Sequence, residues 1–119
     1  WNKVSDSFYA FDFTSSKGDI YIGTYAQGIY KSIDDGLTWT TCNNGLRKGT
    51  DYLTITTLAL GKDNSIICGT LGNGIFKSID QGESWQTFGG TDPNVWAIYS
   101  SEKGTLYAAT ARGIYKTIQ

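Results

Sequence analysis

The feature that most constrains this chain is an eight-residue segment that occurs twice. Residues 32–39 read SIDDGLTW and residues 78–85 read SIDQGESW, so both fit the pattern S-x-D-x-G-x-[TS]-W. The run Gly-Ile-aromatic-Lys precedes both copies and recurs from Gly113, although Gln119 then stands where the pattern has Asp. A repeat of this kind predicts that one supersecondary unit is used several times along the chain.

The spacing of the tryptophans that end the pattern predicts the kind of unit. Trp39 and Trp85 are 46 residues apart, and Trp1, which is followed by residues of the same kind, lies 38 residues before Trp39. Periods of about 40 to 45 residues are typical of the four-stranded sheets of a β-propeller. We therefore predict an all-β fold in which residues 1–119 form a single propeller segment, with repeats at approximately 1–38, 39–84 and 85–119.

Each repeat is interpreted as four antiparallel strands, because β-branched and aromatic residues dominate these segments and no helical period is present. The first strand contains an Ala between large apolar residues, at positions 10, 59 and 97, and we predict that these three positions are equivalent. Turns rich in Gly and Asn precede the second strand. The third strand is the Gly-Ile-aromatic-Lys run, and the fourth begins at each Trp.

The repeated segment has the chemistry of a tight turn between the third and fourth strands. The Asp carboxylate can accept backbone N–H groups, the Gly can adopt a positive φ, and the hydroxyl groups can bond across the turn. The Trp ring is expected to pack between sheets. The predicted structural turn residues are Ser32, Asp34, Gly36, Thr38, Trp39, Ser78, Asp80, Gly82, Ser84 and Trp85.

These two segments resemble Asp-box (BNR) repeats, which are found in sialidases, sortilin-type receptors, some xyloglucan hydrolases and a photosystem assembly factor. The resemblance implies a β-propeller in which the repeated turn is structural and lies away from the active face. It also implies a secreted or periplasmic location, since family members are often found there. The resemblance does not indicate a function.

Three sheets of this kind leave two apolar faces uncovered, and such faces favour association. Propellers usually have four to eight blades, so we predict a homodimer that closes a six-bladed ring, with the strand beginning at Trp1 completing the last blade of the other chain. The alternatives are a piece trimmed from a longer propeller, which the absence of Met and the start at Trp1 favour, and an open three-bladed wedge.

A ligand site is predicted where the loops between second and third strands meet the connections between repeats. Three unlike polar residues precede a Gly there, and the long connection 43–52 adds a cation and an aromatic ring. The predicted ligand-binding residues for a glycan or a peptide are Gln27, Asn73, Arg112, Arg47 and Tyr52. The alternative is that these are ordinary solvated loops. Asp12 is predicted to be an unpaired residue at the channel wall.

Composition excludes several classes of function. The formal net charge is −1, so nothing favours a nucleic acid or an anionic membrane as a partner, and no apolar run is long enough to span a membrane. The chain has no His, so a His-based nucleophile is excluded, and no cofactor or metal is expected, apart from a conceivable Ca²⁺ at Asp34 and Asp35. Cys42 and Cys68 allow either one disulfide or two free thiols.

Three functional hypotheses follow. The first is a non-catalytic binding or scaffold module, which we favour. The second is a fragment of an Asp-box glycoside hydrolase, but two Arg residues in all do not supply the three-Arg cluster of sialidase-like catalysis, and the acidic residues lie mostly in turns. The third is a propeller piece with no evolved task of its own, designed or cut from a parent, although the unequal loops argue against an idealised design.

Overall fold

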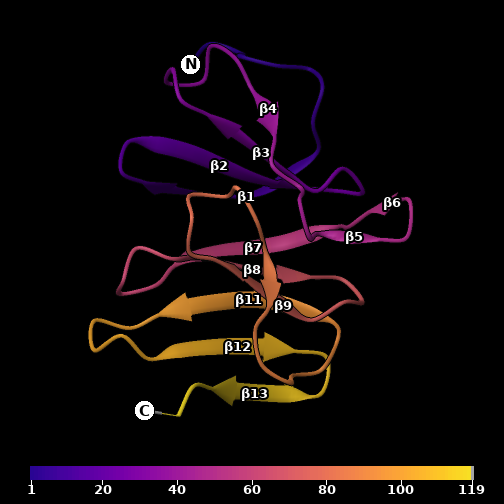
Figure 1. Cartoon of the computed structure of the whole chain (residues 1–119), viewed down its shortest axis with the longest axis vertical. Helices are drawn as coiled ribbons and strands as arrows, with labels where there is room; N and C mark the ends of the chain where they lie inside the picture. The colour runs from indigo at the N-terminus through magenta and orange to yellow at the C-terminus, as the bar shows by residue number, and fades with distance from the viewer. Residues whose placement is uncertain (119) are drawn as a thin grey trace.

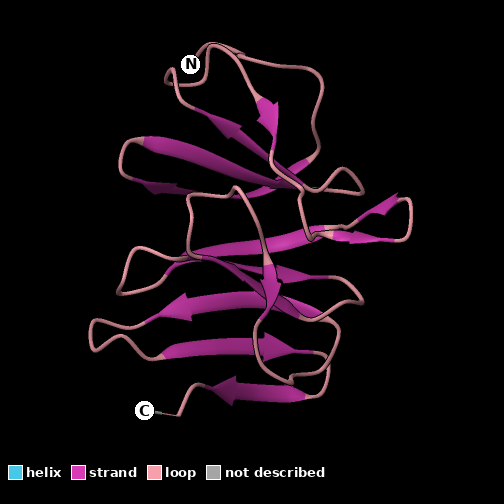
Figure 2. Cartoon of the chain, viewed as in Figure 1, coloured by secondary structure: helices cyan, strands magenta, loops and turns pink. Residues whose placement is uncertain are grey.

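The structure is a computed structural model that describes residues 1–118. Strands, turns and loops account for these residues, and no helix is drawn among them (Figure 2). Consequently, the part of the chain that the structure describes contains no helix long and apolar enough to cross a membrane. The all-β prediction is confirmed.

Three antiparallel sheets follow one another along the chain and are stacked in the same order (Figure 1). Sheet 1 has the order β1-β2-β3-β4, with bounds Ala10–Ser16, Asp19–Thr24, Ile29–Ser32 and Thr40–Thr41. Sheet 2 has the order β7-β8-β9-β10, with bounds Ile55–Leu60, Ile66–Thr70, Ile75–Ser78 and Gln86–Thr87. Sheet 3 has the order β11-β12-β13, with bounds Val95–Ser100, Leu106–Thr110 and Gly113–Lys116. A hairpin of β5 (Arg47–Lys48) and β6 (Asp51–Tyr52) lies in the connection from sheet 1 to sheet 2.

The fourth strands of sheets 1 and 2 begin directly after Trp39 and Trp85, as predicted, but each is only two residues long. Sheet 3 has three strands within the described residues, so β13 is its outer strand. Gln119, at which the third copy departs from the repeat pattern, lies outside the described residues.

A β-bulge in the first strand of every sheet sets the equivalence of the repeats. The bulge follows Ala10 in sheet 1, Ile55 in sheet 2 and Val95 in sheet 3, and these residues pair with Thr24, Thr70 and Thr110. They are therefore the equivalent positions, and the predicted equivalence of Ala10, Ala59 and Ala97 is wrong. The motif of an Ala between large apolar residues fits more than one register, because both faces of these strands are apolar.

Two apolar cores lie between the sheets. Seam 1–2, between sheets 1 and 2, is built around the buried residues Tyr21, Ile29, Leu46, Leu53, Ile55, Leu58, Ile66, Cys68, Phe76 and Trp85. Seam 2–3, between sheets 2 and 3, contains Ala59, Ile67, Ile75, Val95 and Ala108, with Phe88, Ile98 and Leu106 packed against them. Sheet 2 is thus covered on both faces, whereas sheets 1 and 3 are each covered by a neighbouring sheet on one face only. Burial of apolar surface at about 25 cal/mol per Å² holds such stacks together.

Candidate functional site

The molecule has two edges of different chemistry. At the turn edge, Ser16 contacts the β7–β8 turn through Asn64 O, at 3.4 Å, and the β9–β10 turn through Gln81 Nε2, at 3.1 Å. At the connection edge, the β2–β3 and β8–β9 loops contact the connections to the next sheet, because the N–H groups of Gly28 and Gly74 each donate to a connection carbonyl at 2.9 Å. In Figure 1 the β1–β2 and β7–β8 turns lie on the left and the β2–β3 and β8–β9 loops on the right.

The two repeated turns, residues 32–39 and 78–85, have the predicted internal hydrogen bonds. In the first turn, Asp34 Oδ1 accepts the Thr38 N–H at 2.9 Å, and Ser32 Oγ accepts the Gly36 N–H at 2.8 Å. Hydrogen bonds from the Thr38 hydroxyl, then from the Thr38 N–H and the Ser32 hydroxyl, lower the pKa of Asp34 below its ordinary value.

The second turn repeats these bonds at the equivalent residues. Ser84 donates to both oxygens of Asp80, with its N–H at 2.9 Å and its hydroxyl at 2.6 Å, and the Ser84 side chain is the largest cause of the lowered Asp80 pKa. Gly36 and Gly82 have φ values of 88° and 84°, which is why a residue without Cβ stands there. A carboxylate already occupied by three local donors has little capacity to bind a ligand, so we interpret both turns as structural.

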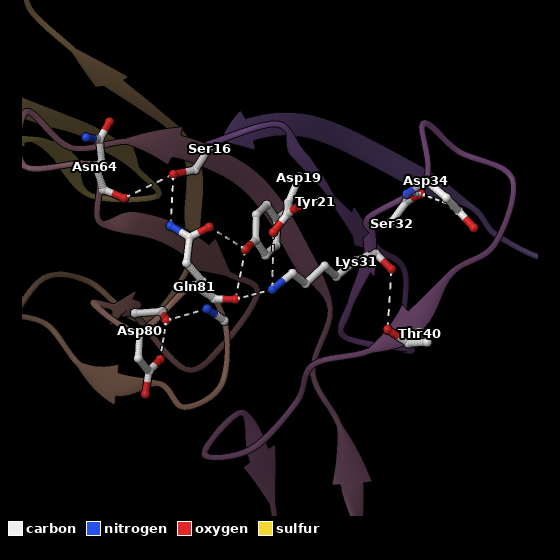
Figure 3. A network of polar contacts seen from close by, with 12 residues as sticks. Ser16, Asp19, Tyr21, Lys31, Ser32, Asp34, Thr40, Asn64, Asp80 and Gln81 are labelled. Atoms are coloured by element: carbon white, nitrogen blue, oxygen red, sulfur yellow. Dashed lines mark hydrogen bonds and ion pairs between the residues drawn. The ribbon is translucent and has the colours of Figure 1, made fainter.

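A polar network joins sheets 1 and 2 at the turn edge (Figure 3). Lys31 Nζ donates to the Gln81 carbonyl at 2.8 Å and lies 3.5 Å from Asp19 Oδ2. The buried Tyr21 hydroxyl donates to the same carbonyl at 2.8 Å. Burial raises the pKa of Tyr21, so this phenol stays protonated and acts as a donor. This network was not predicted from the sequence, although the Lys that recurs at the end of each third-strand run, at positions 31, 77 and 116, is a signal that points to it.

The predicted ligand residues Gln27, Asn73 and Arg112 lie in equivalent loops on the connection edge, as expected. The structure does not join them by any hydrogen bond, and each belongs to a different sheet. Arg112 is exposed, and its Nε lies 3.3 Å from Oδ2 of Asp92, whose side chain is buried. Asp92 Oδ1 also accepts the Asn94 N–H at 2.9 Å. Arg112 therefore forms a structural ion pair, and its ligand-binding role stays a prediction.

Arg47 and Tyr52, the other two predicted residues, face each other across the β5–β6 hairpin. Arg47 Cζ lies 4.2 Å from the centre of the Tyr52 ring, and its Nη2 donates to the Tyr52 hydroxyl at 2.6 Å. The flanking Leu46 and Leu53 are buried in seam 1–2, whereas all four strand residues of the hairpin are exposed. Two buried leucines thus anchor an exposed cation–aromatic pair.

Beside this hairpin a cavity of 540 Å³ follows the outer rim of seam 1–2. Its polar lining includes the side chains of Lys31, Asn44, Arg47, Gln81 and Glu83. A cavity of this size lies within the range of small-ligand pockets. The sequence could not predict this cavity, because the β4 strand and the second repeated turn, which form its walls, are about 40 residues apart.

Asp12 is not an unpaired residue at a channel wall. Its Oδ1 accepts its neighbour's N–H, that of Phe13, at 2.8 Å, and its Oδ2 accepts the Leu58 N–H of sheet 2 at 2.8 Å. The Thr57 hydroxyl also donates to Oδ2 at 3.2 Å. The prediction failed because the assumed equivalence of Ala10, Ala59 and Ala97 makes Gly61 and Tyr99 the equivalents of Asp12, whereas the bulges make Thr57 and Ala97 its equivalents.

Neither cysteine offers an activated nucleophile, and the alternative of two free thiols holds. Burial raises the pKa of Cys42 to about 12 and raises that of Cys68 as well, so both stay protonated at neutral pH. Among residues 1–118 no group of three metal-ligating side chains is gathered.

No protein-family model matches the chain, and no curated protein matches it in sequence. Solved structures do match. The extracellular domain of BT4673 from B. thetaiotaomicron has a TM-score of 0.76 at 15% identity, over 97% of this chain and 16% of that one. A GH74 enzyme from Niastella koreensis has a TM-score of 0.69 at 26% identity, over 87% of this chain and 18% of that one.

The chain folds as a β-propeller segment. PorZ of Porphyromonas gingivalis, a bacterial surface component of the type-IX secretion system, is a further match, with a TM-score of 0.70 at 18% identity over 92% of this chain. The chain spans only 16% to 18% of the length of these three solved chains. Each of the three sheets corresponds to one propeller blade, and the sequence prediction of the fold is confirmed.

Proposed function

We propose that this propeller segment is a non-catalytic binding and scaffold module that takes a glycan at its connection edge. The observation that carries the proposal is the β5–β6 hairpin. The connection 88–94 between sheets 2 and 3 has no such hairpin. The hairpin residues Arg47 and Tyr52 contribute nothing to either apolar core, yet buried neighbours hold them in place. An exposed, pre-organised aromatic ring with a cation beside it is suited to stacking on a sugar ring and to donating to hydroxyl or carboxylate oxygens.

The three non-identical loop residues support the same proposal. Gln27 and Asn73 offer amide groups, which both donate and accept, and Arg112 offers a planar guanidinium. The loops of Gln27 and Asn73 are otherwise alike, because the hydroxyl of Thr24 or Thr70 donates in each to the carbonyl four residues later, at 2.7 Å. The loop of Arg112 is one residue shorter, and there the Thr110 hydroxyl donates to the carbonyl three residues later, at 2.8 Å. Related loops that carry different polar residues are suited to recognition, because binding residues are often found on loops that a rigid scaffold positions.

The absence of catalysis is inferred from what the candidate groups already do. Asp12, Asp34 and Asp80 each accept several hydrogen bonds within the fold, and Asp92 is paired with Arg112. A glycosidase needs one carboxyl group that can protonate a leaving group and a second carboxylate opposite it. The lowered pKa of Asp34 and Asp80 makes both poor acids at neutral pH.

The test is a glycan array followed by calorimetric titration of any ligand found. Replacing Arg47→Ala or Tyr52→Ala is expected to weaken binding by roughly tenfold, the usual size for an interface anchor. Lys103→Ala is the matched control, because it removes an exposed cation from a turn of the turn edge. Equal affinity of all variants, or binding of a peptide library in place of any glycan, contradicts the proposed site.

The second candidate is a fragment of a glycoside hydrolase, favoured by the 26% identity to the GH74 enzyme. It predicts release of reducing ends from a polysaccharide by the purified chain. The binding proposal predicts none, and it predicts that a double Asp34→Asn, Asp80→Asn variant changes stability without changing ligand affinity.

A further inference from the structure

Seams 1–2 and 2–3 are two copies of the same interface. The Gly that opens the third strand donates across each seam, from Gly28 to Leu53 O and from Gly74 to Pro93 O, both at 2.9 Å. A first-strand N–H of the following sheet also donates back across each seam. Leu58 donates to Asp12 at 2.8 Å, and the equivalent Ile98 donates to the hydroxyl of Thr57 at 3.1 Å.

The open faces of sheets 1 and 3 are the two halves of this same interface. On sheet 3, Ile114 is 80% exposed, whereas its equivalents Ile29 and Ile75 are 0% and 8% exposed inside the seams. On sheet 1, Phe13 is 62% exposed, whereas its equivalent Leu58 is 5% exposed. The open face of sheet 3 and the open face of sheet 1 are therefore complementary, because the equivalent faces of neighbouring sheets pack against each other in seams 1–2 and 2–3.

Seam 2–3 contains a cavity at the position that a Trp fills in seam 1–2. There, the Trp85 ring is buried, its Nε1 donates to Cys42 O at 2.8 Å, and its N–H donates to Asn44 O at 2.9 Å. In seam 2–3 the equivalent carbonyls belong to Phe88 and Gly90. They lie beside a cavity of 450 Å³, whose apolar lining includes Ile67, Ile75, Phe88, Ile98, Ala108 and Tyr115.

Sheet 1 has a buried indole N–H group that lacks an acceptor. Trp39 is the equivalent of Trp85, and its Nε1 is the only buried side-chain polar atom within residues 1–118 that has no hydrogen-bond partner. A buried donor without an acceptor costs about 1–3 kcal/mol, so such groups are rare in folded proteins. By analogy with Trp85, the acceptor is a carbonyl three residues after the Trp of the preceding sheet.

Trp1 has the properties required for the cavity. It is fully exposed, and the segment WNKV that it begins matches the segments that begin at Trp39 and Trp85. The third residue after Trp1 is Val4, which is the equivalent of Cys42. The edge of β13 is open on the side where β4 and β10 pair with β3 and β9.

We propose that two copies of this chain assemble head to tail, with the indole of Trp1 of each copy seated in the cavity between sheets 2 and 3 of the other. Residues 2–3 then pair with Lys116 and Tyr115 as the fourth strand of sheet 3, in the register of Thr40 and Thr41 on β3. The Val4 carbonyl of that strand then accepts the indole Nε1–H of Trp39, as the Cys42 carbonyl accepts that of Trp85. The same seam forms twice about a two-fold axis, so the assembly closes as a six-bladed ring instead of growing into a fibre.

Ala97 and Phe13 favour a second copy of this chain over an unrelated protein as the partner of the open faces. At the new seam, Ala97 occupies the position at which Asp12 and Thr57 accept an N–H, and it has no acceptor to offer. The N–H that faces it is that of Phe13, and this group already donates to its own Asp12 at 2.8 Å. Sheet 3, which has no side-chain acceptor at Ala97, thus meets sheet 1, where the Phe13 N–H already has an acceptor in Asp12.

The test is sedimentation velocity of the purified 119-residue chain over a dilution series. The expected species is a dimer of twice 13.0 kDa. Trp1→Ala is expected to raise the dimer dissociation constant by about 10³-fold, because two indoles are lost per dimer and each such anchor is worth a factor of about 30. Leu37→Ala is the control, since it removes another exposed apolar side chain, from the first repeated turn.

Ile114→Glu gives an independent check, because it places a charge on the open face of sheet 3 and is expected to leave a folded monomer. The proposal is overturned by a chain that remains at 13.0 kDa at every concentration, or by a dimer that Trp1→Ala leaves unchanged. The proposal is also overturned if the chain stays monomeric and gains stability only when further sheets are fused to it. These outcomes do not depend on glycan binding, which is measured separately.

Discussion

The two equivalent tryptophans allow a prediction in which the same substitution destabilises the fold at one position much more than at the other. Trp85→Phe removes the hydrogen bond to the Cys42 carbonyl and leaves a gap in seam 1–2. A buried acceptor that loses its donor costs about 1–3 kcal/mol, and the lost packing adds to this, so we expect a destabilisation of about 2–4 kcal/mol.

Trp39→Phe removes a donor that has no acceptor within the described chain. The lost apolar contacts are then offset by the removal of an unsatisfied N–H group. We expect the free energy of unfolding to change by less than about 1 kcal/mol, in either direction.

The assay is urea unfolding of both variants in a Trp1→Ala background, so that the chain is monomeric and dimer contacts do not enter the comparison. Far-UV circular dichroism reports the transition, since both substitutions change the fluorescence directly. Equal destabilisation by the two substitutions would refute the reasoning, because it would mean that the hydrogen bond of Trp85 contributes nothing. The single variant Trp39→Phe in the otherwise unchanged chain should instead weaken the dimer, if the Val4 carbonyl accepts this N–H.

Two further predictions concern the repeated turns and Gly45, whose backbone lies against that of Trp85. The pKa of Asp34 and that of Asp80 are lower in the folded chain than in the unfolded one, so both carboxylates stabilise the fold above about pH 4 and lose this effect as the pH falls through the folded values. Wild type should therefore lose more stability between pH 5 and about pH 2 than the Asp34→Asn, Asp80→Asn variant, measured as the shift in urea midpoint; parallel curves would contradict this assignment. Gly45→Ala should lower the free energy of unfolding by more than about 2 kcal/mol, because Gly45 has a φ of 93° and an added Cβ would collide with the Trp85 carbonyl. Gly49→Ala is the control for the backbone strain alone, because Gly49 has a φ of 63° and no atom lies near its Cβ.

The turn chemistry could be predicted because it is local. All the groups of each repeated turn lie within eight residues, so the positions of the Asp, the Gly and the hydroxyl residues in the sequence are enough to predict which of them bond to each other. The period of the repeat likewise predicted the sheets and their order. The candidate site residues were placed on the predicted edge for the same reason, since alternation of up and down strands fixes which loops share an edge.

The register of the first strands could not be predicted, because bulges shift the pairing and the flanking apolar pattern tolerates the shift. That error concealed the equivalence of Asp12 and Thr57, and with it the hydrogen bonds that cross both seams. The network of Lys31, Tyr21 and Gln81 was equally invisible, because its members are brought together only when the sheets stack.

The sequence by itself thus determined the repeated antiparallel sheet and the number of its copies, since the turns and strands of each copy are specified by residues that are neighbours along the chain. Only the tertiary structure decided which polar groups are satisfied. It supplied an acceptor to Trp85 and none to Trp39, and it left a cavity in one seam where the other holds an indole. Hydrogen bonding and close packing between sheets depend on atoms far apart in the sequence, such as those of Asp12 and Leu58 or of Tyr21 and Gln81, and no local pattern encodes their distances.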